Sequence, residues 1–348
     1  MKLLVDYHHA DLAESHQLVF ADRFSWDVVF PYGMAWFDEW YWSFERGWYG
    51  DAVARQYLLG IWEGAEPDAN GIVEVADTRH PGRTLTGITL EAAKDIRWDI
   101  AMSSVPANAP GFQKIANETG ARFFIHVGNQ WGDEAWSRNP DGAILTTTSV
   151  IPDGIPHVVV HQEFRLDDFR YEQPSGFGPV RSFVNGFPET PEYANFLETA
   201  RKAPDITWEV YGAIGTGTPD EFTKRELHGT PLIGEAMRGA SAIWHAKHWS
   251  DGFGHVIHNA FAVGRPVFGY ARYYADKLAG PLWVEGETSF DVERKASQET
   301  FGIIRRLRED PEYHATLCEN AARRFREVVS FDEDADKIAE LVGIAVPA

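Results

Sequence analysis

The chain has 348 residues, 44% of them hydrophobic, which is more than one hydrophobic core usually organises, so we expect two α/β domains. Asp and Glu outnumber Lys and Arg by 52 to 32, and the net charge of −20 disfavours nucleic acid unless basic residues gather in one cleft. The single cysteine, Cys318, excludes an internal disulfide and any zinc cluster built from cysteines.

Hydropathy along the chain gives no sign of a membrane. No apolar run reaches the roughly 18 to 20 residues that span a bilayer, and Asp6 interrupts the first apolar residues too early for a signal peptide. We therefore expect a cytoplasmic protein that does not contact a membrane.

The first half alternates apolar strands with helices. Residues 2–7 predict a buried strand and 12–22 a helix, and after a Pro, Gly and Asp-rich stretch at 63–83 a strand is predicted near 98–103. A helix at 112–119 and a strand at 121–127 follow, and a crossover of that length implies parallel pairing. The aromatic segment 36–49 has faces that suit sugar rings or bases, although an aromatic helix packed on a core is the commoner explanation.

A second α/β unit follows polar sequence at 165–179. Strands are predicted at 143–150 and 157–161 before this stretch, and at 180–186, 207–212 and 242–245 after it, with helices at 191–202 and 233–238 between them. We expect domains at 1–172 and 180–325, followed by a C-terminal helix within 326–348.

The segment 250–267 has the clearest chemical meaning. After a strand, the loop Ser250-Asp251-Gly252-Phe253-Gly254 turns into a helix from about His255 to Val263, which Gly264-Arg265-Pro266 ends. Glycines at a helix start let backbone N–H groups approach an anion, so a diphosphate would fit there. Gly-rich turns occur in any doubly wound domain, and alone this is weak evidence.

This segment resembles the donor-binding signature of GT-B glycosyltransferases with a family 4-like donor domain: an acidic residue, Gly-Phe-Gly, a helix with a second acidic residue, then small-x-Gly-x-Pro-Val. Asp251 takes the first acidic place and Asn259 the second. Three further segments resemble segments of these enzymes in the same order and at similar spacing, namely residues 164–169, 182–186 and 210–212. The resemblance runs from about 157 to 283. It implies two Rossmann-like domains facing each other across a cleft, with a C-terminal helix at 326–348 that crosses back to the first domain. It also implies no tightly bound cofactor and a UDP- or GDP-sugar as co-substrate. The donor-binding residues that it implies are Gly186, Gly212, Lys247, Asp251, Gly252, Phe253, Gly254, His255 and Asn259.

Two departures from the family pattern concern charge. Asn259 lacks the negative charge with which many relatives bind ribose hydroxyls, and residues 187–192 contain no Arg or Lys to neutralise the diphosphate. Lys247, His245 or Arg265 would then supply the positive charge, or the backbone amides suffice.

Candidate catalytic groups follow the predicted strands of the first domain, because ligands bind beyond the carboxyl ends of parallel strands. His8, His9 and Asp11 follow the first strand, and His126 and Asp133 end or follow the strand at 121–127. An inverting transfer needs one of them as a general base, whereas a retaining transfer does not, and the sequence leaves both open. We expect no metal, because the Asp-x-Asp patterns at 332–336 predict the start of a solvated helix.

The leading hypothesis is a glycosyltransferase that uses a nucleotide sugar. Its specific acceptor candidate is a hydroxymethylated pyrimidine in phage DNA, provided that Lys114, Arg122, Arg138, Arg165 and Arg170 form a basic strip. The alternatives are a sugar-nucleotide epimerase of the same fold and a non-catalytic binding protein. The sugar and the oligomeric state are not determined by the sequence.

Overall fold

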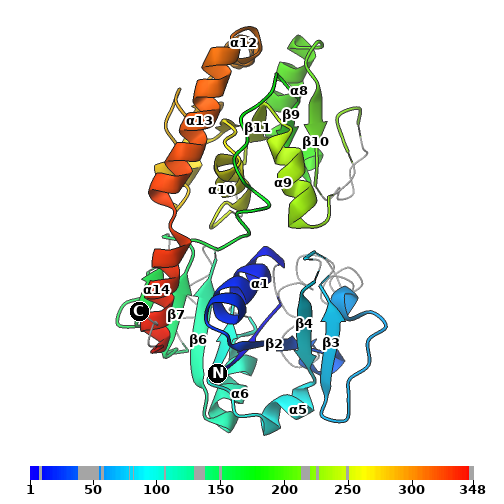
Figure 1. The fold of residues 1–348 in the computed structure, drawn as a ribbon, viewed down its shortest axis with the longest axis vertical. Coiled ribbons are helices and arrows are strands. Elements are labelled where there is room, and N and C mark those ends of the chain that lie inside the picture. The colour runs from blue at the N-terminus through cyan, green and yellow to red at the C-terminus, as the bar shows by residue number, and fades with distance from the viewer. Residues whose placement is uncertain are drawn as a thin grey trace. The chain divides into compact units, whose positions relative to one another are not determined.

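The computed structural model divides the chain into two compact units. Unit 1 comprises Met1–Phe164 and Phe331–Ala348, and unit 2 comprises Arg165–Ser330 (Figure 1). The structure describes residues 1–7, 10–37, 55, 59–77, 79–80, 82–105, 107–128, 138–148, 151–212, 220–224, 227–247 and 251–344. The polar stretch 165–172, which we expected in the first domain, therefore belongs to unit 2.

Unit 1 is built on an eight-stranded sheet in the order β3-β4-β2-β1-β5-β6-β7-β8, and all its neighbours are parallel except the antiparallel pair β3 and β4. Its strands are β1 (Lys2–Val5), β2 (Asp27–Pro31), β3 (Ile72–Ala76), β4 (Thr84–Ile88), β5 (Ile100–Ser103), β6 (Arg122–Val127), β7 (Gly142–Leu145) and β8 (His157–Val159). Its helices are α1 (Ala10–His16), which continues as a π-helical stretch (Gln17–Arg23), α2 (Met34–Trp36), a 3-10 turn (Gly60–Trp62), α5 (Leu90–Asp95), α6 (Ala109–Thr119) and α14 (Phe331–Val342).

The sheet of unit 1 is buried on both faces. On β1, Leu4 packs into the cluster that holds Phe112 of α6, whereas Leu3 and Val5 pack into the cluster with Phe20. Successive side chains of a strand point to opposite faces, so a continuous apolar run such as Leu3-Leu4-Val5 marks a strand covered by helices on both sides.

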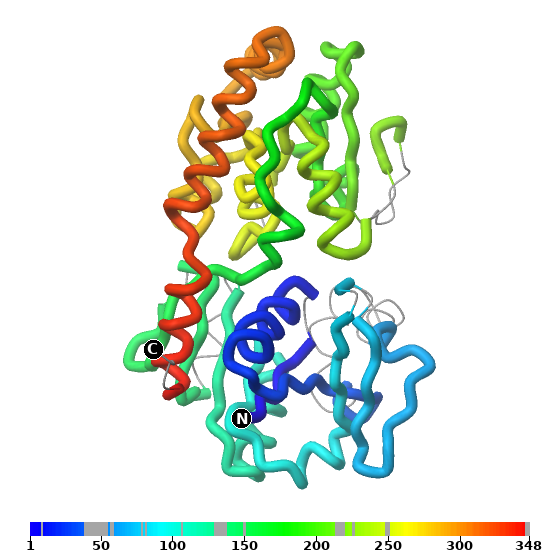
Figure 2. Tube along the Cα trace, viewed as in Figure 1, coloured from blue at the N-terminus to red at the C-terminus, as the bar shows by residue number. Residues whose placement is uncertain are grey.

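The last helix of the chain belongs to unit 1. α14 packs against β7 and β8, and its Ile338 and Val342 are buried in the same cluster as Leu3. In Figure 2 the red end of the tube accordingly lies beside the green segment that carries these two strands. The predicted C-terminal helix is thus observed from Phe331 to Val342.

Unit 2 has a five-stranded, fully parallel sheet in the order β10-β9-β11-β12-β13. Its strands are β9 (Val180–Ser182), β10 (Trp208–Val210), β11 (Ala242–His245), β12 (Val267–Gly269) and β13 (Ser289–Asp291). Its helices are a 3-10 turn (Phe187–Glu189), α8 (Tyr193–Lys202), α9 (Thr230–Arg238), α10 (His255–Ala262), α11 (Ala271–Tyr274), a 3-10 turn (Gly280–Leu282), α12 (Ser297–Glu309) and α13 (Pro311–Val328).

Some elements differ from the sequence prediction. β3 lies inside the stretch 63–83 that we expected to be irregular, and it pairs with β4 as a hairpin at the sheet edge, where its side chains are only partly buried. β3 is apolar except for Glu74, but it is only five residues long and the surrounding Pro, Gly and Asp residues are typical of turns, which explains why the pattern missed this strand. Among the described helices, none has both the length and the hydrophobicity of a membrane span.

Candidate functional site

The carboxyl edge of the unit 2 sheet gathers most of the predicted donor-binding residues. The chain passes from β9 outward to β10 and then returns to β11 on the other side of β9, so the strand order reverses between β9 and β11. Such a switch point is where open α/β sheets bind ligands. Gly186 follows β9, Gly212 follows β10, and Lys247 and Asp251 follow β11.

Gly212 allows two loops at this edge to touch. Its φ is +133°, and a Cβ added there would lie 2.8 Å from Asn185 Oδ1 and 3.0 Å from the Val184 carbonyl oxygen. Only glycine satisfies both the backbone conformation and the close approach. The backbone at Gly212, just after β10, therefore lies directly against Val184 and Asn185, just after β9.

Asp251 is the centre of a hydrogen-bonded cluster. Lys247 Nζ donates to Asp251 Oδ1 at 2.7 Å, the Tyr274 hydroxyl donates to Oδ2 at 2.8 Å, and His245 Nε2 lies 3.0 Å from Oδ2. Burial alone would raise the pKa of the Asp251 carboxyl, but the Lys247 ammonium and the His245 hydrogen bond outweigh it and hold the pKa well below its ordinary value. Asp251 is therefore an anion at every physiological pH.

Gly254 starts helix α10 at the same edge. It is the N-cap residue with φ +80°, and the ring of Phe253 stacks on His258 with centroids 3.9 Å apart. The first N–H groups of a helix have no intrahelical acceptor, and the helix dipole makes this end attractive to anions. Five residues further on, Asn259 is half-buried and its Oδ1 has no hydrogen-bond partner among the described residues.

The structure removes one proposed source of positive charge. The Arg265 guanidinium is buried, and it donates to the carbonyl oxygens of Arg238, Ala240, Glu172, Val263 and Gly264. It holds the end of α10 and the segment before β9, so it cannot neutralise a diphosphate. His245 is also buried against Asp251. Of the three residues considered from the sequence, Lys247 is left, and its ammonium is paired with Asp251.

Sequence reasoning did not identify Tyr273 and Tyr274. The Asp251 backbone N–H donates to Tyr273 Oη at 2.9 Å, and Tyr274 bonds the carboxylate of the same residue. Both tyrosines follow β12 at the carboxyl edge, so the positional rule that selected Lys247 could have selected them as well.

In unit 1 the structure contradicts the choice of His126 as a base. His126 lies within β6 and is buried; its Nδ1 is 2.9 Å from His16 Nε2 and its Nε2 is 3.3 Å from Thr146 Oγ1. Burial lowers the pKa of His126 to about 3. A histidine that is enclosed and this weakly basic cannot take a proton from an acceptor, so we assign it to the core.

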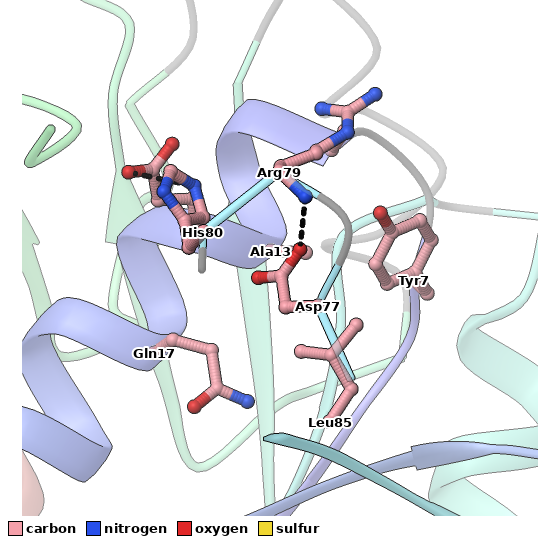
Figure 3. A pocket seen from close by; sticks show the side chains of 9 residues that line it. Tyr7, Ala13, Gln17, Asp77, Arg79, His80 and Leu85 are labelled. Atoms are coloured by element: carbon pink, nitrogen blue, oxygen red, sulfur yellow. Dashed lines mark hydrogen bonds and ion pairs between the residues drawn. The ribbon is translucent and has the colours of Figure 1, made fainter. Parts of the chain in front are cut away.

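Asp11 lies at the start of α1, and Ala13 of the same helix lines a small pocket (Figure 3). Its carboxylate is about one-third exposed and lies 3.8 Å from Arg79 Nη1. Near Asp11 in the sequence, the buried side chain of Glu14 on α1 faces that of His80, with Oε1 and Nε2 3.0 Å apart. This buried contact joins the loop after β3 to α1. The pocket is also lined by Tyr7. His8, His9 and Asp133 lie outside the described residues.

The acidic patterns at 332–336 are not simply solvated. Asp334 is buried and accepts from His161 and Lys337, whereas the exposed Asp332 pairs with Arg23. These carboxylates attach α14 to the rest of unit 1. Within the part of the chain that the structure describes, no group of three or more His, Cys, Asp or Glu side chains is arranged to hold a metal ion.

Comparison with known proteins gives the fold. No family model and no curated protein matches the sequence. Among solved structures, Anabaena HepE in complex with UDP and glucose matches with a TM-score of 0.67 and 13% identity over 99% of both chains. The sucrose-phosphate synthase of Thermosynechococcus elongatus matches with a TM-score of 0.65 and 12% identity over 98% of both chains. An alpha-glucosyltransferase in complex with UDP-glucose and DNA containing an abasic site matches with a TM-score of 0.62 and 10% identity over 99% of both chains.

This chain has the GT-B fold. Its two parallel sheets are the two Rossmann-like domains of that fold, and the expected fold class is confirmed. At identities of 10 to 13% the likeness extends to architecture and not to individual residues.

Proposed function

We propose that this GT-B protein transfers a sugar from a nucleotide-diphosphate sugar, bound by unit 2, to an acceptor hydroxyl. One observation carries the proposal: Asp251, Lys247 and the glycine-capped start of α10 meet at the switch point of a parallel sheet. Structures of the same fold were solved with UDP or UDP-glucose, which supports a UDP-sugar as the donor.

The donor contacts follow from the charges at this edge. The diphosphate would rest on the amides of residues 252–254 and on the first turn of α10, whose dipole stabilises negative charge. Lys247 is 18% exposed and is the cation of the Asp251 cluster, so it can turn from Asp251 toward a phosphate oxygen. Charge builds on the diphosphate as the glycosidic bond breaks, and preorganised donors at this point would lower the barrier. Asn259 Oδ1 is enclosed and has no hydrogen-bond partner among the described residues, so the site would have to open before a ribose hydroxyl could donate to it.

Several residues of unit 1 are candidates for the general base that would deprotonate the acceptor hydroxyl. Asp11 is the candidate base among the described residues, because its carboxylate is accessible and lies just beyond the end of β1. His8, His9 and Asp133 remain candidates from the sequence. A retaining transfer would need none of them, and loss of activity in Asp11→Asn would favour inversion.

Thermal unfolding with added nucleotide tests donor binding. UDP or UDP-glucose at 100 times its Kd should stabilise the protein by about 2.7 kcal/mol. The double variant Asp251→Ala/Gly254→Val should abolish the shift, whereas Asp205→Ala, which removes a surface partner of Arg308, should keep it. If neither UDP- nor GDP-sugars shift the melting temperature of the wild-type protein, the proposal is wrong.

Turnover separates the enzyme from the alternatives of the same fold. Conversion of the sugar to an isomer without an acceptor would identify an epimerase, and binding without any turnover would identify a non-catalytic protein. We expect transfer to be unchanged by EDTA, because the Asp-x-Asp carboxylates of α14 already bind Arg23, His161 and Lys337.

A hydroxymethylated pyrimidine in DNA is the second, more specific candidate for the acceptor. The observation in its favour is the matched alpha-glucosyltransferase that was solved with DNA. The residues of the expected basic strip divide between the units. In unit 1, Arg122 opens β6 and Arg138 precedes β7, so both lie at the amino edge of the sheet, and Arg122 donates to main-chain oxygens of α14. Arg165 and Arg170 belong to unit 2.

The DNA candidate has a direct assay. Hydroxymethylated DNA is incubated with UDP- and GDP-sugars, digested to nucleosides and analysed by mass spectrometry. A nucleoside heavier by one sugar would establish this acceptor, and its formation should fall steeply with salt. Unchanged nucleosides, together with transfer to a small hydroxylated acceptor, would remove it.

A further inference from the structure

Tyr274 contacts both functional parts of the donor loop. It is the last residue of α11 and is completely buried. Its hydroxyl donates to Asp251 Oδ2 at 2.8 Å, and its ring atom Cε1 lies 3.2 Å from the position that a Cβ on Gly254 would occupy. One side chain therefore fixes the carboxylate at the start of the loop and limits the residue type at its end.

The ring of Tyr274 is itself held in place. It stacks on Trp283 with an interplanar angle of 8° and centroids 6.0 Å apart, and the ring of His245 lies 6.1 Å away. Burial and the neighbouring Asp251 carboxylate raise the pKa of the phenol well above its ordinary value. The hydroxyl thus keeps its proton and remains a donor.

The adjacent Tyr273 contacts the main chain of the same residue. Its hydroxyl accepts from the Asp251 N–H at 2.9 Å and donates to the Asp251 carbonyl oxygen at 3.2 Å. Lys277 Nζ lies 3.9 Å from the centroid of the Tyr273 ring and donates to the Tyr273 carbonyl oxygen at 2.6 Å. Tyr273 therefore holds the backbone of Asp251, and Tyr274 holds its side chain.

We propose that Tyr274 is a positioning residue of the donor site, which acts through Asp251: its hydroxyl orients the carboxylate while its ring sets the place of Gly254 and the first turn of α10. The inference rests on the proposed function, because it assigns a purpose to the same loop. Without the phenol, Lys247 still holds Oδ1 but only His245 holds Oδ2, so two side chains instead of three fix the orientation of the carboxylate. The Lys247 ammonium, bonded to Oδ1, would then be presented to the donor in several positions instead of one.

The test is a double-mutant cycle of Tyr274→Phe and Asp251→Asn, read as the Kd for UDP-glucose and as donor and acceptor KM. Tyr274→Phe keeps the ring and removes only the hydroxyl. We expect it to weaken UDP-glucose binding about tenfold and to raise the donor KM, with the acceptor KM unchanged. In the Asp251→Asn background the same substitution should have less than a twofold effect, because the partner through which it acts is gone.

The control variant is Tyr313→Phe, since Tyr313 lies on α13 of the same unit, under the Arg306 guanidinium. It should bind UDP-glucose as the wild type does. Tyr274→Phe binding within twofold of the wild type would overturn the inference, and so would equal losses in both backgrounds, which would indicate general loosening of the unit. The same cycle measured on the free energy of unfolding needs no nucleotide. Failure of the wild type to bind any UDP- or GDP-sugar would refute the proposed function, whereas coupling in unfolding would still show whether Tyr274 acts on Asp251.

Discussion

The two units share a parallel architecture but differ in how their polar residues are used. In unit 2 the predicted residues Lys247, Asp251 and Gly254 converge at one sheet edge. In unit 1 the predicted residues separate: His126 is enclosed in the core and Asp11 lies at the surface. A contiguous loop at a switch point could be recognised as a site, whereas scattered strand-end residues could not.

The units also differ in charge. Unit 1 has 28 Asp and Glu against 12 Lys and Arg, a net charge of −16, whereas unit 2 has 24 against 20, a net charge of −4. The unit proposed to bind an anionic donor is thus the less acidic one, which agrees with electrostatic preference. A DNA acceptor at unit 1 would have to overcome the larger repulsion.

The largest expected effect is on stability. Removing the end of the chain should unfold unit 1, which is built from two separate segments, but not unit 2, which is built from one. Truncation after Ser330 removes α14 and with it the buried Phe331, Ile338 and Val342. Because burial of each large apolar side chain contributes about 1.5 to 3 kcal/mol, unit 1 should lose about 5 kcal/mol or more and unfold, while unit 2, which is one continuous segment, stays folded. Amide hydrogen exchange measures the two separately. Retained protection in β1 and β6 would show that unit 1 folds without its last helix.

A smaller effect is the loss of unit 1 stability in acid, which buried histidines should cause. Burial lowers the pKa of His126 from 6.5 to about 3 and that of His16 in the same direction. The unfolded chain binds protons below pH 6.5 that the folded chain does not accept, so His126 costs about 1.4 kcal/mol of stability per pH unit as the pH falls from 6.5 toward 3. The lowered pKa of His16 acts in the same direction. Urea unfolding of unit 1 at pH 7.5, 6.0 and 5.0 should show this loss. His126→Gln should reduce the slope, and an unchanged slope in that variant would contradict the burial argument.

The smallest effect concerns single glycines in unit 2. Gly254 and Gly286 have φ of +80° and +78°, but only Gly254 has a side chain against the space where a Cβ would lie. Substitution of either by valine should cost about 1 to 2 kcal/mol of backbone strain. Gly254→Val should in addition abolish the thermal shift by UDP-glucose, which Gly286→Val should retain. If both variants bind UDP-glucose equally well, the turn at Gly254 has no role in donor binding.

The sequence alone determined the parallel α/β class and the glycine-capped α10. These features depend on short-range preferences: apolar runs for buried strands, glycine at a positive φ, and a crossover too long for a hairpin. The pattern was least informative at the β3–β4 hairpin, because the short apolar run of β3 lies among the Pro, Gly and Asp residues of the stretch 63–83.

Only the tertiary structure decided what each polar residue does. Tyr274 and Asp251 are 23 positions apart, and His16 and His126 are 110 apart, and no local pattern records either contact. Arg265 and His126 look like functional groups in the sequence, yet both are buried among main-chain or core partners. The physical reason is that pKa and hydrogen bonding depend on burial and on neighbours from distant segments, which exist only once the chain has packed.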